Sequence, residues 1–434
     1  MEKNKDCPAL YRAGENISAT VNGVRYDVLE TEAAYFVTAP CREKETVELV
    51  FGTGTGPYAI RPKRLGIAAA QEGRTLRFQI PSPLNLFIEP GGEEKPLFFY
   101  GVRPETYDGK ATYYFPAGQV YQTGELRLRS GESVYIERGA VVRGMISAYD
   151  AENIKIYGQG ILDNSYYADR KESRKTIRLV RCSRAVIQDI TLIKPTAWMI
   201  LIAGCRDVTV SGIHEIGEIV SSDGIDIVGS QNVTVSGCML RNNDDCVVVK
   251  HTTQEQDGVC NPEELLAVRN IEVKDCVLYN APAGNALEIG FELNCEQVSG
   301  IRFQNIDILR VDGIGAALSI HVSDRALVRD VLYDHIYIEH YYSRLIDFRV
   351  VQSQWGVSEE KGRIEDVTLQ NIFVTKSIAN EGYSVSVIGG YDDTHLVKRV
   401  KFSNFCFNGS AVCHKNELDL FERNTEAVEV VGDA

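Results

Sequence analysis

Residues 207–240 decide the fold. They read Asp207-Val-Thr-Val-Ser-Gly-Ile and, one repeat later, Asn232-Val-Thr-Val-Ser-Gly-Cys-Met-Leu. Each phrase is a polar residue, an apolar-polar-apolar triplet, a small or polar pair, and a second apolar run. Such alternation buries every second side chain of a short strand, and the central pair makes a bend between two strands. Recurrence of one phrase at a short interval predicts a repeat architecture.

The same phrase recurs on both sides of this stretch, from about residue 115 to about residue 410. Its first apolar residue falls at positions 154, 186, 208, 233, 271, 301, 331, 367 and 400. The shortest interval, 22 residues, matches one bare coil of a parallel β-helix, and the longer intervals match a coil plus a loop. Coils stack at about the 4.8 Å spacing of neighbouring strands. Residues one coil apart in the sequence should therefore be neighbours in space.

The first 100 residues lack this phrase. Short strand-like runs such as Val47-Glu-Leu-Val-Phe and Leu76-Arg-Phe-Gln-Ile alternate there with turn signals such as Gly52-Thr-Gly-Thr-Gly-Pro. Short strands at this spacing favour a small β-sandwich. We therefore expect an all-β chain, with a sandwich domain over residues 1–105 and a β-helix domain that carries the function over residues 106–434.

The composition limits the partners. A formal charge of −14 argues against nucleic acid, because phosphate binding needs clustered Lys and Arg. It also disfavours a strongly anionic polymer, unless a local basic pocket overcomes the global charge. The sequence contains no run of about 18 apolar residues, so it predicts no membrane span. An oligosaccharide or polysaccharide is the expected partner, and association into a homo-oligomer is left open.

The N-terminus and the cysteines bear on the compartment. Residues 1–8 contain no apolar run typical of a signal peptide, so we expect a cytoplasmic protein, or a secreted or periplasmic one if a signal peptide has been removed. The 11 cysteines are scattered through predicted strands, which favours reduced core residues over a disulfide framework. The sequence contains no Cys-x-x-Cys pair, so a zinc site is not expected.

Two acidic segments lie one coil apart: Ser221-Ser-Asp-Gly-Ile-Asp-Ile-Val and Asn242-Asn-Asp-Asp-Cys-Val-Val-Val. Asp223 and Asp245 are 22 residues apart, the bare-coil interval, so Asp223, Asp244 and Asp245 should cluster on one face. Asp226 competes for the outward position beside Asp223. Clustered carboxylates raise at least one pKa, and a protonated acid beside ionised neighbours is what glycoside hydrolysis uses. The alternative is an Asx ladder or a bound cation.

These segments resemble glycoside hydrolase family 28, the polygalacturonases and their relatives. The similarity includes Gly124-Glu-Leu-Arg-Leu-Arg-Ser-Gly, Gly158-Gln-Gly-Ile-Leu-Asp and Pro195-Thr-Ala-Trp-Met-Ile. The resemblance implies a right-handed, pectin-lyase-like solenoid and an inverting hydrolase that needs no metal or other cofactor. It also implies that Asp244 is the general acid and that Asp223 and Asp245 activate the water.

The chain departs from the family at two elements. Asn285 stands where the family has the His of Gly-His-Gly, and Ser319-Ile-His321 stands where it has Arg-Ile-Lys. Ser and His cannot replace a bidentate Arg–carboxylate contact, so we expect a substrate other than galacturonate. A looser similarity to the family 49 dextranases and isopullulanases, in the sandwich and in Asn285-Ala-Leu-Glu-Ile-Gly-Phe-Glu, also suggests neutral sugars.

Five residues are the candidates for substrate binding: Asn285, Glu292, His321, His251 and Trp355. Trp355 could stack on a sugar ring, whereas Trp198 is expected to pack at a coil corner. For Glu292 the alternative is a solvated loop residue, and for His321 and His251 it is a hydrogen-bonded strand histidine. Two other functions remain open: a polysaccharide lyase or epimerase, and a non-catalytic carbohydrate-binding solenoid.

Overall fold

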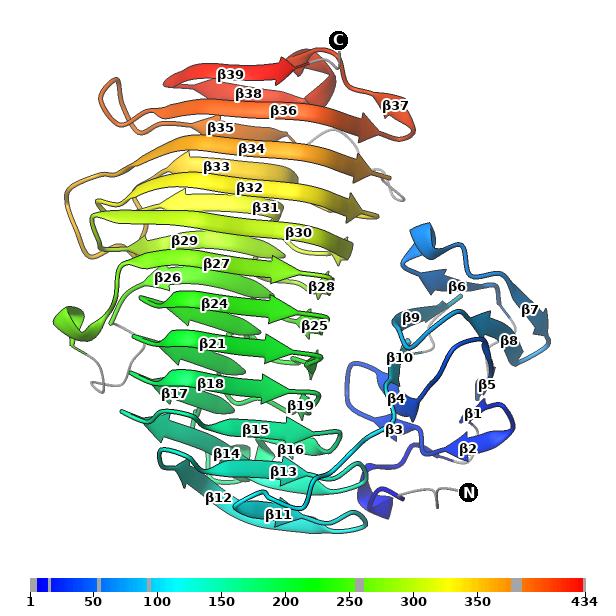
Figure 1. Cartoon of the computed structure of the whole chain (residues 1–434). Coiled ribbons are helices and arrows are strands. Elements are labelled where there is room, and N and C mark those ends of the chain that lie inside the picture. The colour runs from blue at the N-terminus through cyan, green and yellow to red at the C-terminus, as the bar shows by residue number, and fades with distance from the viewer. Residues whose placement is uncertain are drawn as a thin grey trace.

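The computed structural model describes residues 6–14, 17–52, 56–91, 95–253, 261–375 and 385–431. From Tyr113 onward the chain forms a right-handed parallel β-helix, in which 29 strands are hydrogen-bonded into one continuous network. Figure 1 shows the coils stacked in chain order, with the N-terminal strands as a separate body beside the lower coils. The all-β prediction is confirmed.

The N-terminal body is two packed five-stranded sheets with a common apolar core. One sheet holds β1 (Ser18–Val21), β2 (Val24–Tyr26), β5 (Glu45–Val50), β7 (Ala69–Glu72) and β8 (Thr75–Ile80), and the other holds β3 (Leu29–Glu30), β4 (Tyr35–Pro40), β6 (Tyr58–Arg61), β9 (Asn85–Pro90) and β10 (Leu97–Val102).

Each regular coil of the β-helix contributes one strand to each of three parallel faces. We call the first the site sheet: β17 (Ile177–Val180), β20 (Ile200–Ala203), β23 (Ile225–Val228), β26 (Val247–His251), β29 (Leu287–Leu293), β31 (Ala316–Val322), β33 (Arg344–Val350), β35 (Ser386–Gly389) and β38 (Leu420–Arg423). The docking sheet holds β16 (Ile161–Asp163), β19 (Thr191–Ile193), β22 (His214–Ile216), β25 (Met239–Asn242) and β28 (Val277–Asn280), and continues into the second half of β30.

The third sheet is the longest. It comprises β13 (Ser133–Ile136), β15 (Lys155–Gly158), β18 (Ser183–Gln188), β21 (Arg206–Ser211), β24 (Gln231–Ser236), β27 (Val268–Lys274), β30 (Gln297–Val311), β32 (Leu327–Ile338), β34 (Arg363–Val374), β36 (Val397–Phe407) and β39 (Thr425–Val431). The remaining strands are β11 (Tyr113–Phe115), β12 (Val120–Leu128), β14 (Val141–Tyr149) and β37 (Ser410–Ala411). Helical turns are short: α1 (Ser165–Ala168), η1 (Ala9–Tyr11), η2 (Lys63–Leu65), η3 (Pro262–Glu264) and η4 (Lys415–Leu418).

The repeated phrase explains this geometry. Its alternate apolar residues, such as Val233 and Val235, are fully buried in one core that runs through the solenoid. Its leading residue lies near the start of a third-sheet strand and has a positive φ, which Asn, Asp and Gly adopt most easily. This holds at Asp207, Asn232, Asn270, Gly300, Asp330, Asp366 and Arg399.

The coil cysteines also fit the prediction. All six belong to the solenoid core: Cys182, Cys205, Cys238, Cys246, Cys276 and Cys295. The ten described cysteines are free thiols, and Cys260 lies outside the described residues.

The sandwich packs on the outer face of the docking sheet. The Tyr100 ring stacks on His214 at a centroid distance of 3.9 Å, and Asn85 Oδ1 lies 3.1 Å from His214 Nε2. Tyr11 donates to Asp163 Oδ2 over 2.6 Å. The last sandwich strand ends at Val102 and β11 begins at Tyr113, so the expected boundary at 105/106 falls in the connection. The site sheet is left uncovered by the sandwich (Figure 1).

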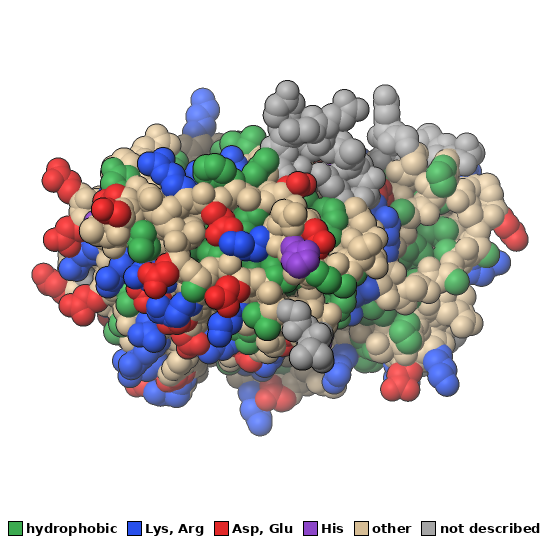
Figure 2. Space-filling model, turned by 90° about the horizontal axis from the view of Figure 1, so that it is seen from above, with side chains coloured by type: hydrophobic (Ala, Val, Ile, Leu, Met, Phe, Trp, Pro, Cys, Tyr) green, Lys and Arg blue, Asp and Glu red, His purple; other side chains and the backbone are tan. Residues whose placement is uncertain are grey.

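On the face of the molecule that is seen from above, acidic and basic side chains are interspersed (Figure 2). No helix among the described residues combines the length and the apolar character needed to cross a membrane.

Candidate active site

A cavity of about 600 Å³ lies on the outer face of the site sheet. Its walls come from coils between residues 173 and 355, and they include all three predicted catalytic aspartates. The lining also includes Lys175, Trp198, Lys250, Gly284, Asn285, Glu292, His321, Arg344, Asp347, Arg349 and Trp355.

The aspartates meet because successive coils are in register just before each site strand begins. The Met199 N–H donates to Asp223 C=O over 2.7 Å, the Gly224 N–H to Asp245 C=O over 2.8 Å, and the Cys246 N–H to Asn285 C=O over 3.0 Å. Asp223, Asp245 and Asn285 therefore occupy equivalent positions of three consecutive coils. The 22-residue spacing of the two aspartates is one bare coil, as predicted.

The three carboxylates form a compact cluster. One oxygen of each of Asp223, Asp244 and Asp245 lies within 4.8 Å of the others. Both Asp244 and Asp245 line the cavity, because the chain bends between the end of β25 at Asn242 and the start of β26. Gly284 packs against this bend with φ +68°, and a Cβ there would lie 2.6 Å from Asp244 Oδ1. Any larger residue would displace Asp244.

Burial and mutual repulsion change the protonation of this cluster. Burial, followed by the charge of Asp223, raises the pKa of Asp244 to about 6. Burial and the charge of Asp244 raise the pKa of Asp245 well above its ordinary value. Two N–H groups of Asn285 oppose that rise, because they donate to Asp245 Oδ1 over 2.7 Å from the backbone and 3.0 Å from the side chain. Asp244, which is only half-buried, can hold a proton near neutral pH and present it to the cavity.

Asn285 is held in place by the next coil. Its Oδ1 accepts the Ala316 N–H over 2.8 Å, so each polar group of its side chain is engaged by the protein. Asn280 supports the same region, since its Nδ2 donates to Asp244 C=O over 2.8 Å. The predicted sugar contact at Asn285 is thus, in this structure, a contact that orients Asp245.

A buried lysine accompanies the aspartates. Lys250 Nζ lies 3.1 Å from Asp223 Oδ2 and 3.3 Å from Asp226 Oδ1, and it stands 4.1 Å from the centroid of the Trp198 ring. Burial alone would lower the pKa of Lys250, but Asp223 and Asp226 raise it well above its ordinary value. Asp226 faces outward, as the alternation predicted, but it is completely buried.

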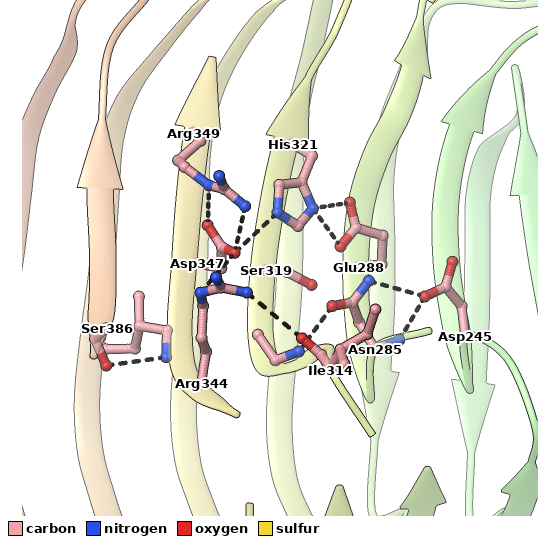
Figure 3. Close-up of polar contacts among 12 residues, drawn as sticks. Asp245, Asn285, Glu288, Ile314, Ser319, His321, Arg344, Asp347, Arg349 and Ser386 are labelled. Carbon is pink, nitrogen blue, oxygen red and sulfur yellow. Dashed lines mark hydrogen bonds and ion pairs between the residues drawn. The ribbon is translucent and has the colours of Figure 1, made fainter. Parts of the chain in front are cut away.

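A second charged row crosses the next three coils (Figure 3). His321 Nδ1 lies 3.0 Å from both oxygens of Glu288, and its Nε2 lies 3.4 Å from Asp347 Oδ2. Burial lowers the pKa of His321, but Glu288 and Asp347 outweigh burial and raise it to about 9. Arg349 donates twice to Asp347, and Arg344 Nε lies 3.5 Å from the same carboxylate.

The remaining candidates divide. Glu292 is buried at the cavity wall, and Trp355 is 47% exposed there. His251 differs from the prediction: it lines a second cavity with Glu263, Asn294 and Arg325. On β26, Val247 and Val249 face the core and Lys250 faces the cavity, but the pairing with β29 shifts between Val249 and His251. That shift carries His251 away from the aspartates.

Several residues at the cavity or buried behind it were not predicted from the sequence. Lys250, which lines the cavity, and Glu288, which is buried behind His321, carried a signal, because each alternates with core residues on a strand beside the aspartates. Trp198 is buried as expected, yet it also lines the cavity. Lys175 and Arg344 lie outside the repeated phrase, so the repeat gave no signal for them.

Comparisons with known proteins identify relatives of this architecture. Residues 126–320, which include the three aspartates, match the family described as Glycosyl hydrolases family 28. A polygalacturonase from Gossypium barbadense is 24% identical over 191 residues, which are 38% of this chain and 47% of that protein. An exopolygalacturonase from Cochliobolus carbonum is 27% identical over 168 residues, 32% of this chain and 38% of that protein. The chain thus spans less than half the length of these relatives.

Solved structures share the fold. Dex49A from Penicillium minioluteum superposes with a TM-score of 0.64 at 13% identity, covering 95% of this chain and 92% of that chain. A hyperthermoactive exopolygalacturonase from Thermotoga maritima gives a TM-score of 0.55 at 16% identity, covering 69% and 84%. The expected resemblance to family 28, and the looser one to family 49, are confirmed.

Proposed function

We propose that this chain, whose β-helix resembles glycoside hydrolase family 28, hydrolyses an O-glycosidic bond of an oligosaccharide or polysaccharide. The observation that carries the proposal is the cluster of Asp223, Asp244 and Asp245 within 4.8 Å at the wall of an open cavity. Glycoside hydrolysis needs one protonated acid and one ionised carboxylate beside the scissile bond.

The environments of the carboxylates support a division of roles. Asp244 reaches the cavity with a pKa raised to about 6, so it serves as the general acid that protonates the leaving oxygen. Asp223, beside the Lys250 ammonium, serves as the carboxylate that deprotonates the water, and Asp245, held by two N–H donors from Asn285, serves to orient it. Water then attacks the anomeric carbon as the C–O bond to the leaving group breaks.

The stereochemical course follows from the family resemblance. Inverting enzymes usually separate their two carboxyl groups by about 6.5–9.5 Å, and retaining enzymes by about 5–5.5 Å. The oxygens here lie within 4.8 Å, so distance alone would suggest retention. We propose inversion, because a pair of aspartates that shares one water leaves no single carboxylate as a nucleophile. Proton NMR of the first-formed anomer tests this point.

The charges around the cavity favour a neutral sugar. Four cations of the cavity already face the protein's own carboxylates: Lys250 faces Asp223 and Asp226, His321 faces Glu288 and Asp347, and Arg349 and Arg344 face Asp347. At these four cations a uronate carboxylate would compete with a carboxylate of the protein. Sugar hydroxyl groups, in contrast, can donate to Glu292 and Asp347, and the exposed Trp355 ring offers a face for stacking.

The test is a screen of the purified chain on matched neutral and uronic oligosaccharides, with Asp244→Asn as the inactive variant. Asp330→Asn, on the third sheet and paired with Arg302, is the matched control. We expect reducing ends to appear with the wild type and the control, and a loss of roughly 1,000-fold with Asp244→Asn. An unsaturated product that absorbs in the ultraviolet would instead indicate a lyase. Binding without turnover, unaffected by Asp244→Asn, would indicate a carbohydrate-binding solenoid.

A further inference from the structure

Lys250 is a cation placed inside the acidic cluster, not at its edge. Its side chain is 7% exposed, and its two ion-pair partners, Asp223 and Asp226, are 5% and 0% exposed. Both partners come from the preceding coil, where β23 pairs in register with β26. The Trp198 ring covers the ammonium group from the coil before that. Water is thus largely kept from this group of two aspartates and one ammonium.

We propose that Lys250 is a positioning residue that divides the acidic cluster, holding Asp223 as a carboxylate so that the catalytic proton resides on Asp244. The inference rests on the proposed function and adds a residue to it. Lys250 acts chiefly through Asp223, with which it forms an ion pair; its charge also lowers the pKa of Asp244, but among the described residues no ion pair joins it to that general acid.

Asp223 and Asp244 have different hydrogen-bond partners, and the difference favours a charged Asp223. Lys250 Nζ makes its shortest ion pair, 3.1 Å, with Asp223. Asp244 instead accepts two backbone N–H groups, from Ser221 and Asp245, both at 3.1 Å. A charge-assisted bond to an ammonium stabilises a buried carboxylate more than a neutral N–H does. The proton shared by the cluster therefore favours Asp244 over Asp223.

Asp226 completes the division. It is fully buried, and burial and the charge of Asp223 raise its pKa well above the ordinary value. Of the two acids that share Lys250, Asp226 is thus the one that takes up a proton, which leaves the ammonium to Asp223. The charged groups that face Lys250 from the surrounding coils are Asp223, Asp226, Asp244, Asp245, Glu292 and, across the Trp198 ring, Lys175.

The test is the pH profile of kcat/KM for Lys250→Met on the substrate found in the screen. Without the ammonium, the carboxylate that activates the water loses its 3.1 Å ion pair, so the acidic limb of the profile should move up by at least about one pH unit. We expect kcat to fall on the order of 100-fold and KM to change less than about threefold. Lys398→Met, which removes a lysine paired with Glu426 at 2.9 Å outside the cavity, is the control and should keep both limbs.

Lys250→Met leaves two buried acids without their cation, a cost that can prevent folding, so a second variant keeps the test decisive. Lys250→Met/Asp226→Leu removes the lysine together with the more deeply buried of its two acid partners and replaces both with apolar side chains, which lowers the cost of folding, and it also deprives Asp223 of its ammonium. The same upward shift is expected. A folded double variant with the wild-type acidic limb would overturn the role of Lys250 while leaving the hydrolase intact. A wild type that hydrolyses nothing would overturn the proposed function, and this inference with it.

Discussion

Asn285 binds a single oxygen of Asp245 twice, through its backbone N–H at 2.7 Å and its side-chain N–H at 3.0 Å. The two residues occupy equivalent positions of adjacent coils, so strand pairing itself brings them together. An asparagine that looked like a lost catalytic histidine is therefore part of the apparatus that keeps Asp245 oriented. Its substitution should affect chemistry more than binding.

Asn285→Asp tests this relationship. The change keeps the shape of the side chain but replaces an N–H donor with a carboxylate that faces Asp245, so repulsion should turn Asp245 away from the water. We expect kcat to fall roughly 100-fold with KM within about threefold of wild type. Asn305→Asp is the control, because Asn305 Nδ2 donates to Asp275 at 2.7 Å outside the cavity. Equal losses in both variants would contradict the role of Asn285.

Activity should decline as pH rises through about 6. The general acid must be protonated, and burial and Asp223 raise the pKa of Asp244 only to about 6. Above that pH the fraction of protonated Asp244 falls about tenfold per pH unit. Measuring kcat/KM from pH 4 to pH 9 checks this, and a flat profile between about pH 6 and pH 8 would assign the acid to another group.

The loop that carries Trp355 is fastened by Asp324. One oxygen of this buried carboxylate accepts the N–H groups of Val357 and Ser358, both at 2.7 Å, and the other accepts the Leu293 N–H at 2.9 Å. Asp324→Asn puts an N–H donor against one of these donors and should release the loop. We expect KM to rise about tenfold with kcat little changed.

Fluorescence gives an independent measure of this release. The chain has 2 tryptophans, and Trp198 is buried, so a change in emission on Asp324→Asn reports Trp355. Asp392→Asn is the matched control, since Asp392 also accepts backbone N–H groups, from Thr394 and His395, in a surface turn. Unchanged emission and KM in Asp324→Asn would show that the loop is held by other contacts.

Glu215 makes stability depend on pH. It points into the solenoid, where its Oε2 accepts from Asn242 Nδ2 over 3.0 Å, and burial raises its pKa to about 8. The folded state therefore binds a proton that the unfolded state releases above about pH 4.5, so this group's contribution to stability falls as pH rises from 4.5 to 8. The free energy of unfolding of Glu215→Gln, measured relative to wild type, should therefore be higher at pH 7 than at pH 4.5 by on the order of 2–3 kcal/mol.

Urea unfolding of wild type and Glu215→Gln at both pH values measures this difference. Glu359→Gln, on an exposed loop, is the control and should leave the pH dependence as it is in wild type. A Glu215→Gln variant that loses stability equally at both pH values would mean that the carboxylate is ionised inside the core.

The sequence predicts the fold because the repeat is local. The positions equivalent to Val233 and Val235 face the core in the successive coils, so the pattern of one coil predicts how the coils stack. It predicts the aspartate cluster for the same reason, since Asp223 and Asp245 are separated by one coil without a loop. Loops make this prediction impossible further along the chain. Asp245 and Asn285 are 40 residues apart, a coil plus a loop, so the length of a bare coil does not show that they are neighbours.

The rest of the site depends on contacts that the repeated sequence pattern does not predict. Alternation shows that Lys250 and Asp226 face outward, but not that Trp198 from another coil covers them. His251 is predicted as a candidate for substrate binding, whereas a local shift in strand pairing places it in a different cavity. The docking of Tyr100 on His214 likewise joins segments whose patterns are unrelated.

The register of Asp223 with Asp245 has a consequence for how such a site can change. The backbones of Asp223 and Asp245 are separated by the spacing between neighbouring strands, about 4.8 Å, and that spacing is fixed by the hydrogen bonds between coils. Side-chain substitutions can change the direction of a carboxylate but cannot change the position of its backbone in the stack. A new substrate must therefore be accommodated by the outer walls and loops, while the distance between the reacting groups can change only in steps of a whole coil.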